Sequence, residues 1–296
     1  MMTPIVPLAL AVSLLAPLQS TPRARPRASD ARTRSVHVSV ADAKGAPVSG
    51  LAAADFVVRE DGVAREVLKA APATGAMQIA LVVDDSQAAT QAVQQLREGL
   101  TAFIDTLKGK AEIAVVTVGE RPTSLVQYTT DTAALKKAVG RMFSRPGSGA
   151  YLTEGLLDVS KGLQKRNARR PVIVAITFDG VEYSNQQYQT VLDQLFASRA
   201  TLHVLEVGLP PATSDDEMRN RNLVIAEGTQ QSGGRRDQLL SYMAIPDRLR
   251  QVADELISQY VVTYARPDTL IPPEKISVGV TRQGLTVRAR TRVAGK

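Results

Sequence analysis

The feature that most constrains the fold is a repeated alternation of short apolar runs with amphipathic helical segments in the middle of the chain. Mostly apolar runs at 77–83, 112–118 and 171–178 have the length and β-branched composition of strands buried on both faces, and the run at 201–208 is predicted to be a further strand. Between and after them, apolar residues recur at helical spacing, as in 93–107 and 246–260. Strands and helices that alternate in this way form a parallel sheet covered on both sides. We therefore predict an α/β fold with a doubly wound, mostly parallel sheet.

The two flanks of this region have a different pattern, in which apolar and polar residues alternate as in half-buried strands. The segment 35–74 contains strand-like runs around an Asp-Gly turn at 61–62. The segment 266–296 contains another pair of runs around a Gln-Gly turn at 283–284, which predicts a second hairpin. A few isolated strands are not stable alone. We therefore expect both segments to form one small β-sandwich beside an α/β domain at 77–265.

The first residues of the sequence have the pattern of an export signal. Residues 1–20 contain no charged side chain, and their apolar run at 5–18 is short for a membrane span. This is typical of a secretory signal peptide, with an uncleaved anchor as the alternative. The Pro- and Arg-rich stretch 21–34 is predicted to be a disordered linker. We expect an extracytoplasmic protein, periplasmic or secreted, with no membrane span in the mature chain.

The composition excludes several classes of function. The chain has no Cys, which excludes disulfides, thiolate zinc sites and cysteine nucleophiles. Both histidines, His37 and His203, lie in strand-like runs and are expected to pack there. Aromatic residues make up 4% of the chain, which disfavours stacking on single-stranded nucleic acid. The net charge of +7 is spread along the chain, and Arg288, Arg290 and Arg292 are expected on one solvated sheet face. No nucleic-acid reading element is present, so no nucleic-acid partner is expected.

Polar residues follow the predicted buried strands at their carboxyl ends. Asp84 and Ser86 come directly after the first of these strands, and Asp179 follows a later one. The Gly-rich loop before the helix at 151–167 adds the hydroxyls of Ser148 and Thr153. Ligands of doubly wound sheets bind at this edge, where the strand order reverses. Carboxylate and hydroxyl oxygens suit Mg²⁺ or Mn²⁺, so these residues are the candidate metal site.

The order of these motifs resembles the von Willebrand factor A domain. The chain has D-x-S at 84–86, a Gly-rich loop before a helix, and D-G at 179–180. Its flanking segments are similar to those of the secreted bacterial group of von Willebrand factor A-related proteins, well represented in acidobacteria. The resemblance implies a Rossmann-like fold with a metal-ion-dependent adhesion site, D-x-S-x-S followed by a Thr and the Asp of D-G. It also implies a non-catalytic protein that mediates protein binding or adhesion at the cell envelope.

Carried over residue by residue, the adhesion site is incomplete. Asp84, Ser86 and Asp179 match the motif, whereas Ala88 stands at the second Ser and Ala150 at the Thr. A methyl group cannot replace a hydroxyl ligand. The resemblance therefore implies a degenerate site and no resident cofactor. If the remaining oxygens still bound an ion, it would be Mg²⁺ or Mn²⁺.

The same edge is the expected surface for contact with a protein partner. Asp85 is interpreted as a solvated turn residue of this rim, with Ser148 and Thr153 beside it. The segment 209–223 reads as a long loop over the same edge, and long loops on rigid scaffolds often carry function. We expect this loop to contribute to partner contact.

Two enzyme or signalling classes are the alternatives. The run LVVDDS at 81–86 is also typical of a phosphorelay receiver, which would use Mg²⁺ and a third, phosphorylated Asp. No Asp ends a third strand in the required order, because Asp131 reads as a helix cap and Asp179 comes too late. A hydrolase on a doubly wound sheet is the other alternative. The chain lacks the G-x-S-x-G elbow and the G-x-x-x-x-G-K-[ST] loop that would support it.

Overall fold

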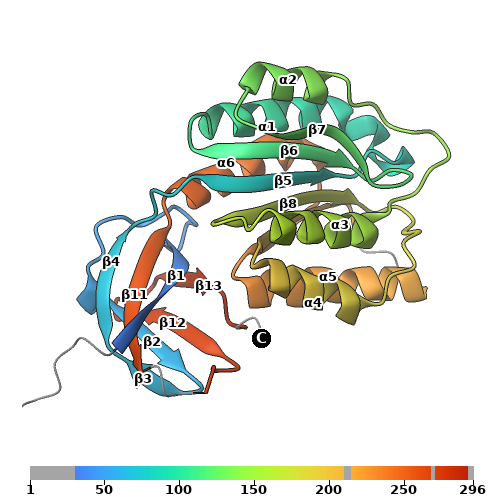
Figure 1. Cartoon of the computed structure of the whole chain (residues 1–296). Helices are drawn as coiled ribbons and strands as arrows, with labels where there is room; N and C mark the ends of the chain where they lie inside the picture. Colours follow the sequence, from blue (N-terminus) through green and yellow to red (C-terminus); the bar gives the residue numbers. More distant parts are fainter. Residues whose placement is uncertain (1–30, 210–214, 268–270, 293–296) are drawn as a thin grey trace, which may run out of the picture.

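A computed structural model describes residues 31–209, 215–267 and 271–292. The described chain forms two lobes, an α/β domain and a β-sandwich (Figure 1). The predicted signal peptide and most of the predicted linker lie outside the described residues. None of the helices in the described part of the chain has the length and hydrophobicity to cross a membrane.

The α/β domain is built on one six-stranded sheet with the order β10-β9-β8-β5-β6-β7. All neighbouring strands are parallel except β6 and β7. This confirms the predicted doubly wound, mostly parallel sheet. The strands are β5 (Met77–Val83), β6 (Ala111–Thr117), β7 (Thr123–Thr129), β8 (Pro171–Phe178), β9 (Thr201–Val207) and β10 (Arg235–Leu239).

Helices cover both faces of this sheet (Figure 1). One face packs against α1, α2 and α6, and the other against α3, α4 and α5. Alternate residues of β5 enter the two cores, with Ile79 and Leu81 on one side and Ala80 and Val82 on the other. The helices are α1 (Val93–Thr106), α2 (Thr132–Gly140), α3 (Leu152–Lys165), α4 (Tyr188–Ser198), α5 (Asp216–Ser232) and α6 (Ile245–Ile257), with short 3₁₀ turns η2 (Gln87–Ala92) and η3 (Tyr242–Ala244).

The second lobe is a β-sandwich made from both flanks of the chain. One sheet has the order β13-β1-β11-β4 and the other β12-β2-β3. Their inner faces enclose a separate core that includes Val38, Phe56 and Val262. The strands are β1 (Ala31–Ala41), β2 (Phe56–Glu60), β3 (Val63–Arg65), β4 (Val67–Pro72), β11 (Tyr260–Pro267), β12 (Ile276–Val280) and β13 (Thr286–Ala289), and η1 (Ala53–Asp55) precedes β2.

The details of the sandwich differ from the sequence-based expectation in three ways. Residues 31–34, expected in the linker, form the start of β1. Strand β11, expected within the α/β domain at 77–265, pairs instead with β1 and β4. The predicted hairpin at 266–296 forms only at its open end, where Lys275 and Arg292 make an isolated antiparallel bridge, because β12 pairs with β2 while β13 pairs with β1. The turn at 283–284 therefore connects a strand of one sheet to a strand of the other.

The expected solvated arginine face is also wrong, because these side chains meet the α/β domain. Arg288 donates to Glu255 of α6 with an Nη2–Oε2 distance of 2.6 Å. Arg292 lies 3.3 Å from Asp193 of α4, and its guanidinium stacks over the ring of Phe196. This strand face lies between the lobes, where arginines bridge to partners that local sequence does not reveal.

Candidate functional site

The carboxyl ends of β5 and β8 lie side by side at the point where the sheet reverses its strand order. From β5 the chain continues to β6 on one side, and from β8 to β9 on the other. We call this edge of the sheet the carboxyl rim, formed by residues 84–92, 141–151, 179–187, 208–209 and 240–244. Doubly wound sheets place their ligand sites at this edge, and Asp84, Ser86 and Asp179 lie on it.

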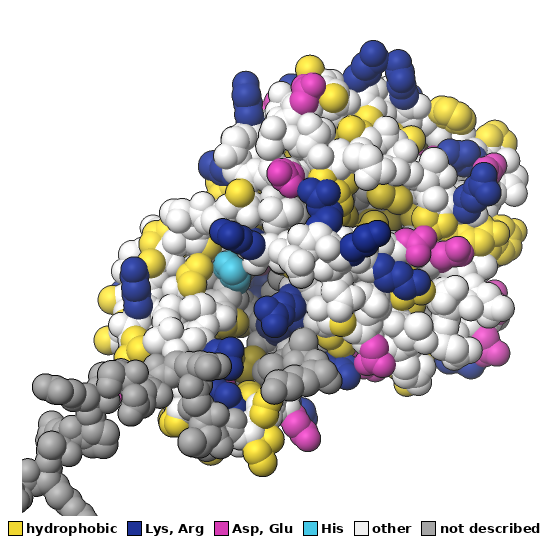
Figure 2. Space-filling view, in the orientation of Figure 1, with side chains coloured by type: hydrophobic (Ala, Val, Ile, Leu, Met, Phe, Trp, Pro, Cys, Tyr) yellow, Lys and Arg dark blue, Asp and Glu magenta, His cyan; other side chains and the backbone are white. Residues whose placement is uncertain are grey.

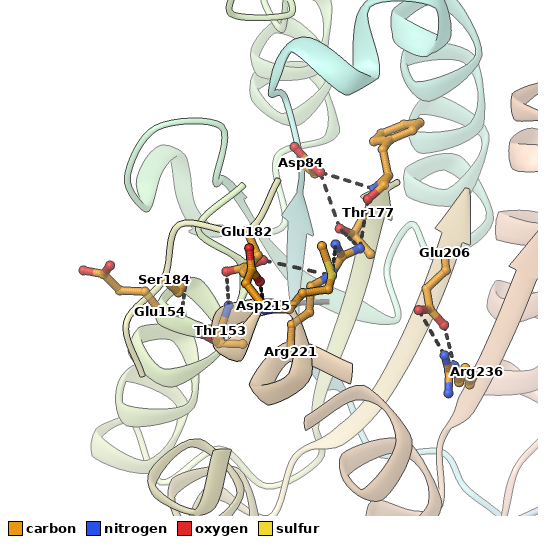
Figure 3. Close-up of polar contacts among 12 residues, drawn as sticks. Asp84, Thr153, Glu154, Thr177, Glu182, Ser184, Glu206, Asp215, Arg221 and Arg236 are labelled. Atoms are coloured by element: carbon orange, nitrogen blue, oxygen red, sulfur yellow. Dashed lines mark hydrogen bonds and ion pairs between the residues drawn. The ribbon is translucent and has the colours of Figure 1, made fainter. Parts of the chain in front are cut away.

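Asp84 is fully buried at the centre of the carboxyl rim (Figure 3). Its Oδ1 accepts a hydrogen bond from the Ser86 amide at 2.9 Å. Its Oδ2 accepts from the Phe178 amide at 3.2 Å and from the Thr177 hydroxyl at 3.4 Å. Both carboxylate oxygens are therefore held by groups of the protein itself.

A buried arginine lies beneath this carboxylate. Arg221 of α5 is 4% exposed, and its Nη2 donates to Thr177 Oγ1 and to the Phe178 carbonyl, both at 2.9 Å. Thr177 thus connects the guanidinium to Asp84 (Figure 3). Arg221 places a permanent positive charge below the point where an adhesion site would hold a cation.

A second buried carboxylate shares the same arginine. Glu182 is 2% exposed, and its Oε2 lies 4.0 Å from Arg221 Nε. Its Oε1 accepts a long hydrogen bond of 3.4 Å from the Thr153 amide at the start of α3. One guanidinium therefore stands between two carboxylates that come from different loops of the rim (Figure 3).

The environment shifts the pKa of both acids in the same direction. Burial raises the pKa of Asp84 above its ordinary value, and the charge of Arg221 opposes that rise. Burial raises the pKa of Glu182 to about 7, again opposed by Arg221. Desolvation disfavours the charged form of a carboxyl group, and a nearby cation favours it. In this site burial is the stronger of the two effects.

The predicted metal site has few hydroxyl groups. Ser86 Oγ and Thr153 Oγ1 are buried and have no hydrogen-bond partner among the described residues. Ala88 presents its methyl group toward Gly180, where an added Cβ would come within 2.9 Å of it. Ala150 is fully buried. At both alanines the site presents methyl groups where the motif has hydroxyls.

Asp179 is exposed and lies over β9. A Cβ added to Gly208 would stand 2.3 Å from Asp179 Cγ, so this carboxylate rests against the bare backbone at the end of β9. Gly208 has a φ of +109°, a conformation that favours glycine. Among the described residues, no group of three or more His, Asp or Glu is arranged to hold a metal ion.

Asp85 is not the solvated turn residue expected from the sequence. It is 5% exposed, and its carboxylate accepts from the Gly119 amide at 2.7 Å and from Arg145 Nε at 3.0 Å. The carbonyl of Arg145 in turn accepts from the Ser148 hydroxyl at 2.8 Å. Asp85 therefore attaches the Gly-rich loop to the sheet. Of the three expected rim contacts, only Ser148 keeps part of its surface accessible, because Thr153 is buried as well.

Large apolar side chains surround this buried network. Each is at least half exposed, and all lie in the loops of the carboxyl rim: Phe143, Val181, Tyr183, Leu209, Leu240 and Met243. A groove of about 520 Å³ runs between η2 and the end of β10, lined among others by Ala88, Asp179 and Leu240. Exposed apolar side chains gathered in one area are typical of protein interaction surfaces.

Two residues of the network were not predicted, and only one leaves a signal in the sequence. Arg221 occupies the apolar face of α5, three residues after Met218 and four before Ile225, both buried. A lone arginine at such a position indicates a buried cation. The predicted loop 209–223 is wrong from residue 216 onward, where α5 begins, and residues 210–214 lie outside the described part. Glu182 has no comparable signal, because it lies in an irregular loop.

Comparison with known proteins agrees with this geometry. Residues 79–182 match the family model of the von Willebrand factor type A domain. Comparison with curated protein sequences found no match. One similar structure is a von Willebrand factor type A protein from Catenulispora acidiphila, with a TM-score of 0.50, 12% identity, and coverage of 89% of this chain and 72% of that one.

Proximal thread matrix protein 1 from the mussel byssus is also similar in fold. Its structure gives a TM-score of 0.53 at 15% identity and covers 67% of this chain and 50% of that chain. A second structure of the byssus protein, with a zinc-occupied MIDAS motif, gives a TM-score of 0.51 at 16% identity, with coverage of 67% and 49%. The present chain spans about half the length of the byssus protein. At these identities the likeness establishes the fold.

Proposed function

Because residues 79–182 belong to the von Willebrand factor type A domain family, we propose that the protein is a non-catalytic binding protein that uses the carboxyl rim to contact another protein without a metal ion. The observation that carries this proposal is the combination of a buried network, formed by Asp84, Glu182 and Arg221, with exposed apolar side chains around it. We further propose that the protein acts outside the cytoplasm, which rests on the apolar, uncharged run at 5–18.

The absence of a metal is proposed from the donor set. Both carboxylate oxygens of Asp84 accept hydrogen bonds from groups of the protein. The side chains of Ala88 and Ala150 contain no oxygen that could bind a metal, and the Asp179 carboxylate lies against Gly208. Arg221 supplies a positive charge beside the buried carboxylates. A divalent ion entering this site would lie close to a guanidinium that cannot be deprotonated. The degenerate site is thus better suited to holding the rim rigid than to binding an ion.

The surface chemistry supports contact with an apolar protein surface. Leu240 and Met243 both lie in the segment that follows β10, and both are more than 60% exposed. Exposed Tyr183 and Phe143 add aromatic area of the kind enriched in protein interfaces. The network beneath them keeps the loops in place, which lowers the ordering cost of binding.

The test is capture of partners from an envelope extract by the immobilised protein. Leu240→Asp combined with Met243→Asp should abolish capture of the proteins that the wild type retains. Leu68→Asp combined with Val63→Asp is the matched control, because these side chains are exposed on the sandwich lobe. Equal capture by both double variants would refute the rim as the contact surface.

The metal-free part of the proposal has a separate readout. Capture should be unchanged when EDTA replaces Mg²⁺ in the buffer, and calorimetric titration with Mg²⁺ or Mn²⁺ should give no heat of specific binding. Micromolar binding that Asp84→Ala abolishes would overturn the metal-free proposal. That result would not bear on whether the carboxyl rim is the contact surface.

A further inference from the structure

A second cavity lies between the two lobes, at the opposite end of the sheet from the carboxyl rim. It has a volume of about 340 Å³ and is bordered by the starts of β8 and β9, the ends of α4 and α5, and strands β1, β11 and β12. Figure 2 shows Lys and Arg side chains and a histidine around the hollow between the lobes. We call this cavity the arginine pocket, after the five arginines that line it: Arg34, Arg169, Arg170, Arg199 and Arg290.

The charge of the arginine pocket is not neutralised by carboxylates. No Asp or Glu is among the described residues that line it. None of its five arginines forms an ion pair within the described part of the chain, although Arg288 and Arg292, on the same segment as Arg290, both do. A cavity of this size with five positive charges and no counter-charge is unusual, because buried or clustered charges are normally paired.

Two of the arginines are fixed in place by backbone carbonyls. Arg170 is 6% exposed and donates to the carbonyls of Ala73, Gly75 and Leu256, while its buried Nε has no partner among the described residues. Arg290 donates to the carbonyls of Phe196 and Ala200 at the end of α4. These contacts hold the guanidinium groups rigidly and partly compensate their charge through the negative ends of helices α4 and α6.

Burial and the remaining positive charge shift the pKa values of groups in the pocket. Burial, with the charges of Arg170 and Arg290, lowers the pKa of His37 to about 4. Burial, with the charge of Arg199, lowers the pKa of Arg290 to about 10. Burial, reinforced by the two arginine charges, therefore keeps His37 neutral at physiological pH.

We propose that the arginine pocket binds a small oxyanion, the phosphate or sulfate group of a low-molecular-weight ligand. Arginine presents a planar fork of donors that matches such groups, and its charge does not depend on pH in the physiological range. Arg169 and Arg199 are exposed, and their side chains make no hydrogen bond within the described part of the chain, so both guanidinium groups are available at the pocket mouth. Apolar walls from Val36, Pro171 and Val172 leave room for an uncharged part of the ligand.

The size of the cavity favours a small ligand over a polymer. Its volume of about 340 Å³ lies at the lower end of the range for small-molecule sites. The pocket lies between two lobes rather than along an open groove, and its charge is gathered rather than spread in a stripe. A nucleic acid would need an extended basic track with a reading element.

The experiment is calorimetric titration of the wild-type chain with inorganic pyrophosphate, inorganic phosphate and sulfate at constant chloride concentration. We expect a dissociation constant below about 1 mM for at least one phosphate probe. Arg169→Gln combined with Arg199→Gln should weaken binding at least tenfold. Tighter binding of phosphate than of sulfate would identify a phosphate ligand, and the reverse order a sulfated one.

A matched control removes the same charge elsewhere. Arg121→Gln combined with Arg141→Gln changes two exposed arginines that make no ion pair within the described residues. It should leave the dissociation constant within twofold of wild type. Equal weakening in both double variants would show general attraction to a basic protein and would overturn the proposal. Absence of binding to all three probes would overturn it as well.

His37 offers a second readout inside the pocket. The chain has only two histidines, and His203 is fully buried, so the His37 ring signals can be assigned by a single substitution. A bound oxyanion should raise the pKa of His37, because it offsets Arg170 and Arg290. A tightly binding probe that leaves the His37 titration unchanged would place the anion outside the pocket. This outcome would contradict the proposal without bearing on the carboxyl rim.

Discussion

The carboxyl rim and the arginine pocket lie at opposite ends of the same sheet, and they differ in whether their positive charge is paired with carboxylates. At the rim, Arg221 stands between Asp84 and Glu182, so opposite charges are brought together inside the protein. In the pocket, five arginines meet without a carboxylate among the described lining residues. Charge that is compensated internally stabilises a shape, whereas charge that is left uncompensated is available to a ligand. The comparison thus separates a structural polar cluster from a candidate binding site.

The largest effect is expected from removal of Arg221, the cation that lies between the buried carboxylates beneath the carboxyl rim. Arg221→Ala would leave two buried carboxyl groups without their compensating charge. We expect the free energy of unfolding to fall by about 3–5 kcal/mol, the usual cost of breaking a buried ion pair on one side. Denaturation by urea measures it. Arg219→Ala, on the exposed face of the same helix, is the control and should change stability by less than about 1 kcal/mol.

A comparable loss in the two variants would mean that Arg221 does not compensate the rim carboxyls, and the contrast between the two regions would fail. If Arg221→Ala did not fold, Arg221→Ala combined with Glu182→Gln would still decide the point. Removal of one carboxylate should restore part of the lost stability when the two groups are energetically coupled.

The next effect is a pH dependence from Glu182. The folded chain holds its proton more tightly than the unfolded chain, because its pKa is about 7 rather than 4.5. Its contribution to stability is therefore fully present below pH 4.5 and is lost as the pH rises through about 7. The difference in unfolding free energy between wild type and Glu182→Gln should change by up to about 3 kcal/mol over this window.

The unfolding free energy of wild type must be compared with that of Glu182→Gln, because His37 in the arginine pocket changes stability with pH in the opposite direction. His37 has a folded-state pKa of about 4 against an ordinary value of 6.5, so its contribution is lost as the pH falls through that window. Wild-type stability alone would mix the two trends. A Glu182→Gln profile parallel to that of wild type would show that Glu182 titrates normally.

The smallest effect is expected from removal of one unpaired charge from the arginine pocket. Arg199→Gln should raise the free energy of unfolding slightly, by roughly a few tenths of a kcal/mol, because it removes the repulsion between Arg199 and Arg290. The gain is small because Arg199 is exposed and solvent screens its charge. The gain should shrink in high salt or with saturating pyrophosphate. A clear loss of stability would instead assign Arg199 a structural role and would weaken the contrast with the rim.

Local sequence patterns predicted the elements but not the contacts between lobes. Apolar runs such as Met77–Val83 are buried on both sides whatever surrounds them, so the α/β sheet follows from the sequence. The position of Asp84 at a strand end likewise follows from parallel strand geometry. The pairing of β12 and β13 with different sheets does not, because a tight turn is compatible with either arrangement. The pocket arginines come from four separate segments, because Arg169 and Arg170 are neighbours, and only the folded chain brings them together.

The α/β domain is inserted between two strands that lie side by side in the sandwich. Strand β4 enters it and β11 leaves it, and Pro72 pairs with Tyr260 at the junction. The Ala73 amide donates to the Gln259 carbonyl at 2.8 Å, which closes the junction completely. A pulling force applied to β1 and β13 would pass through the hydrogen bonds of the sandwich and bypass everything between these two points. The rim would therefore keep its shape under tension until the sandwich itself came apart.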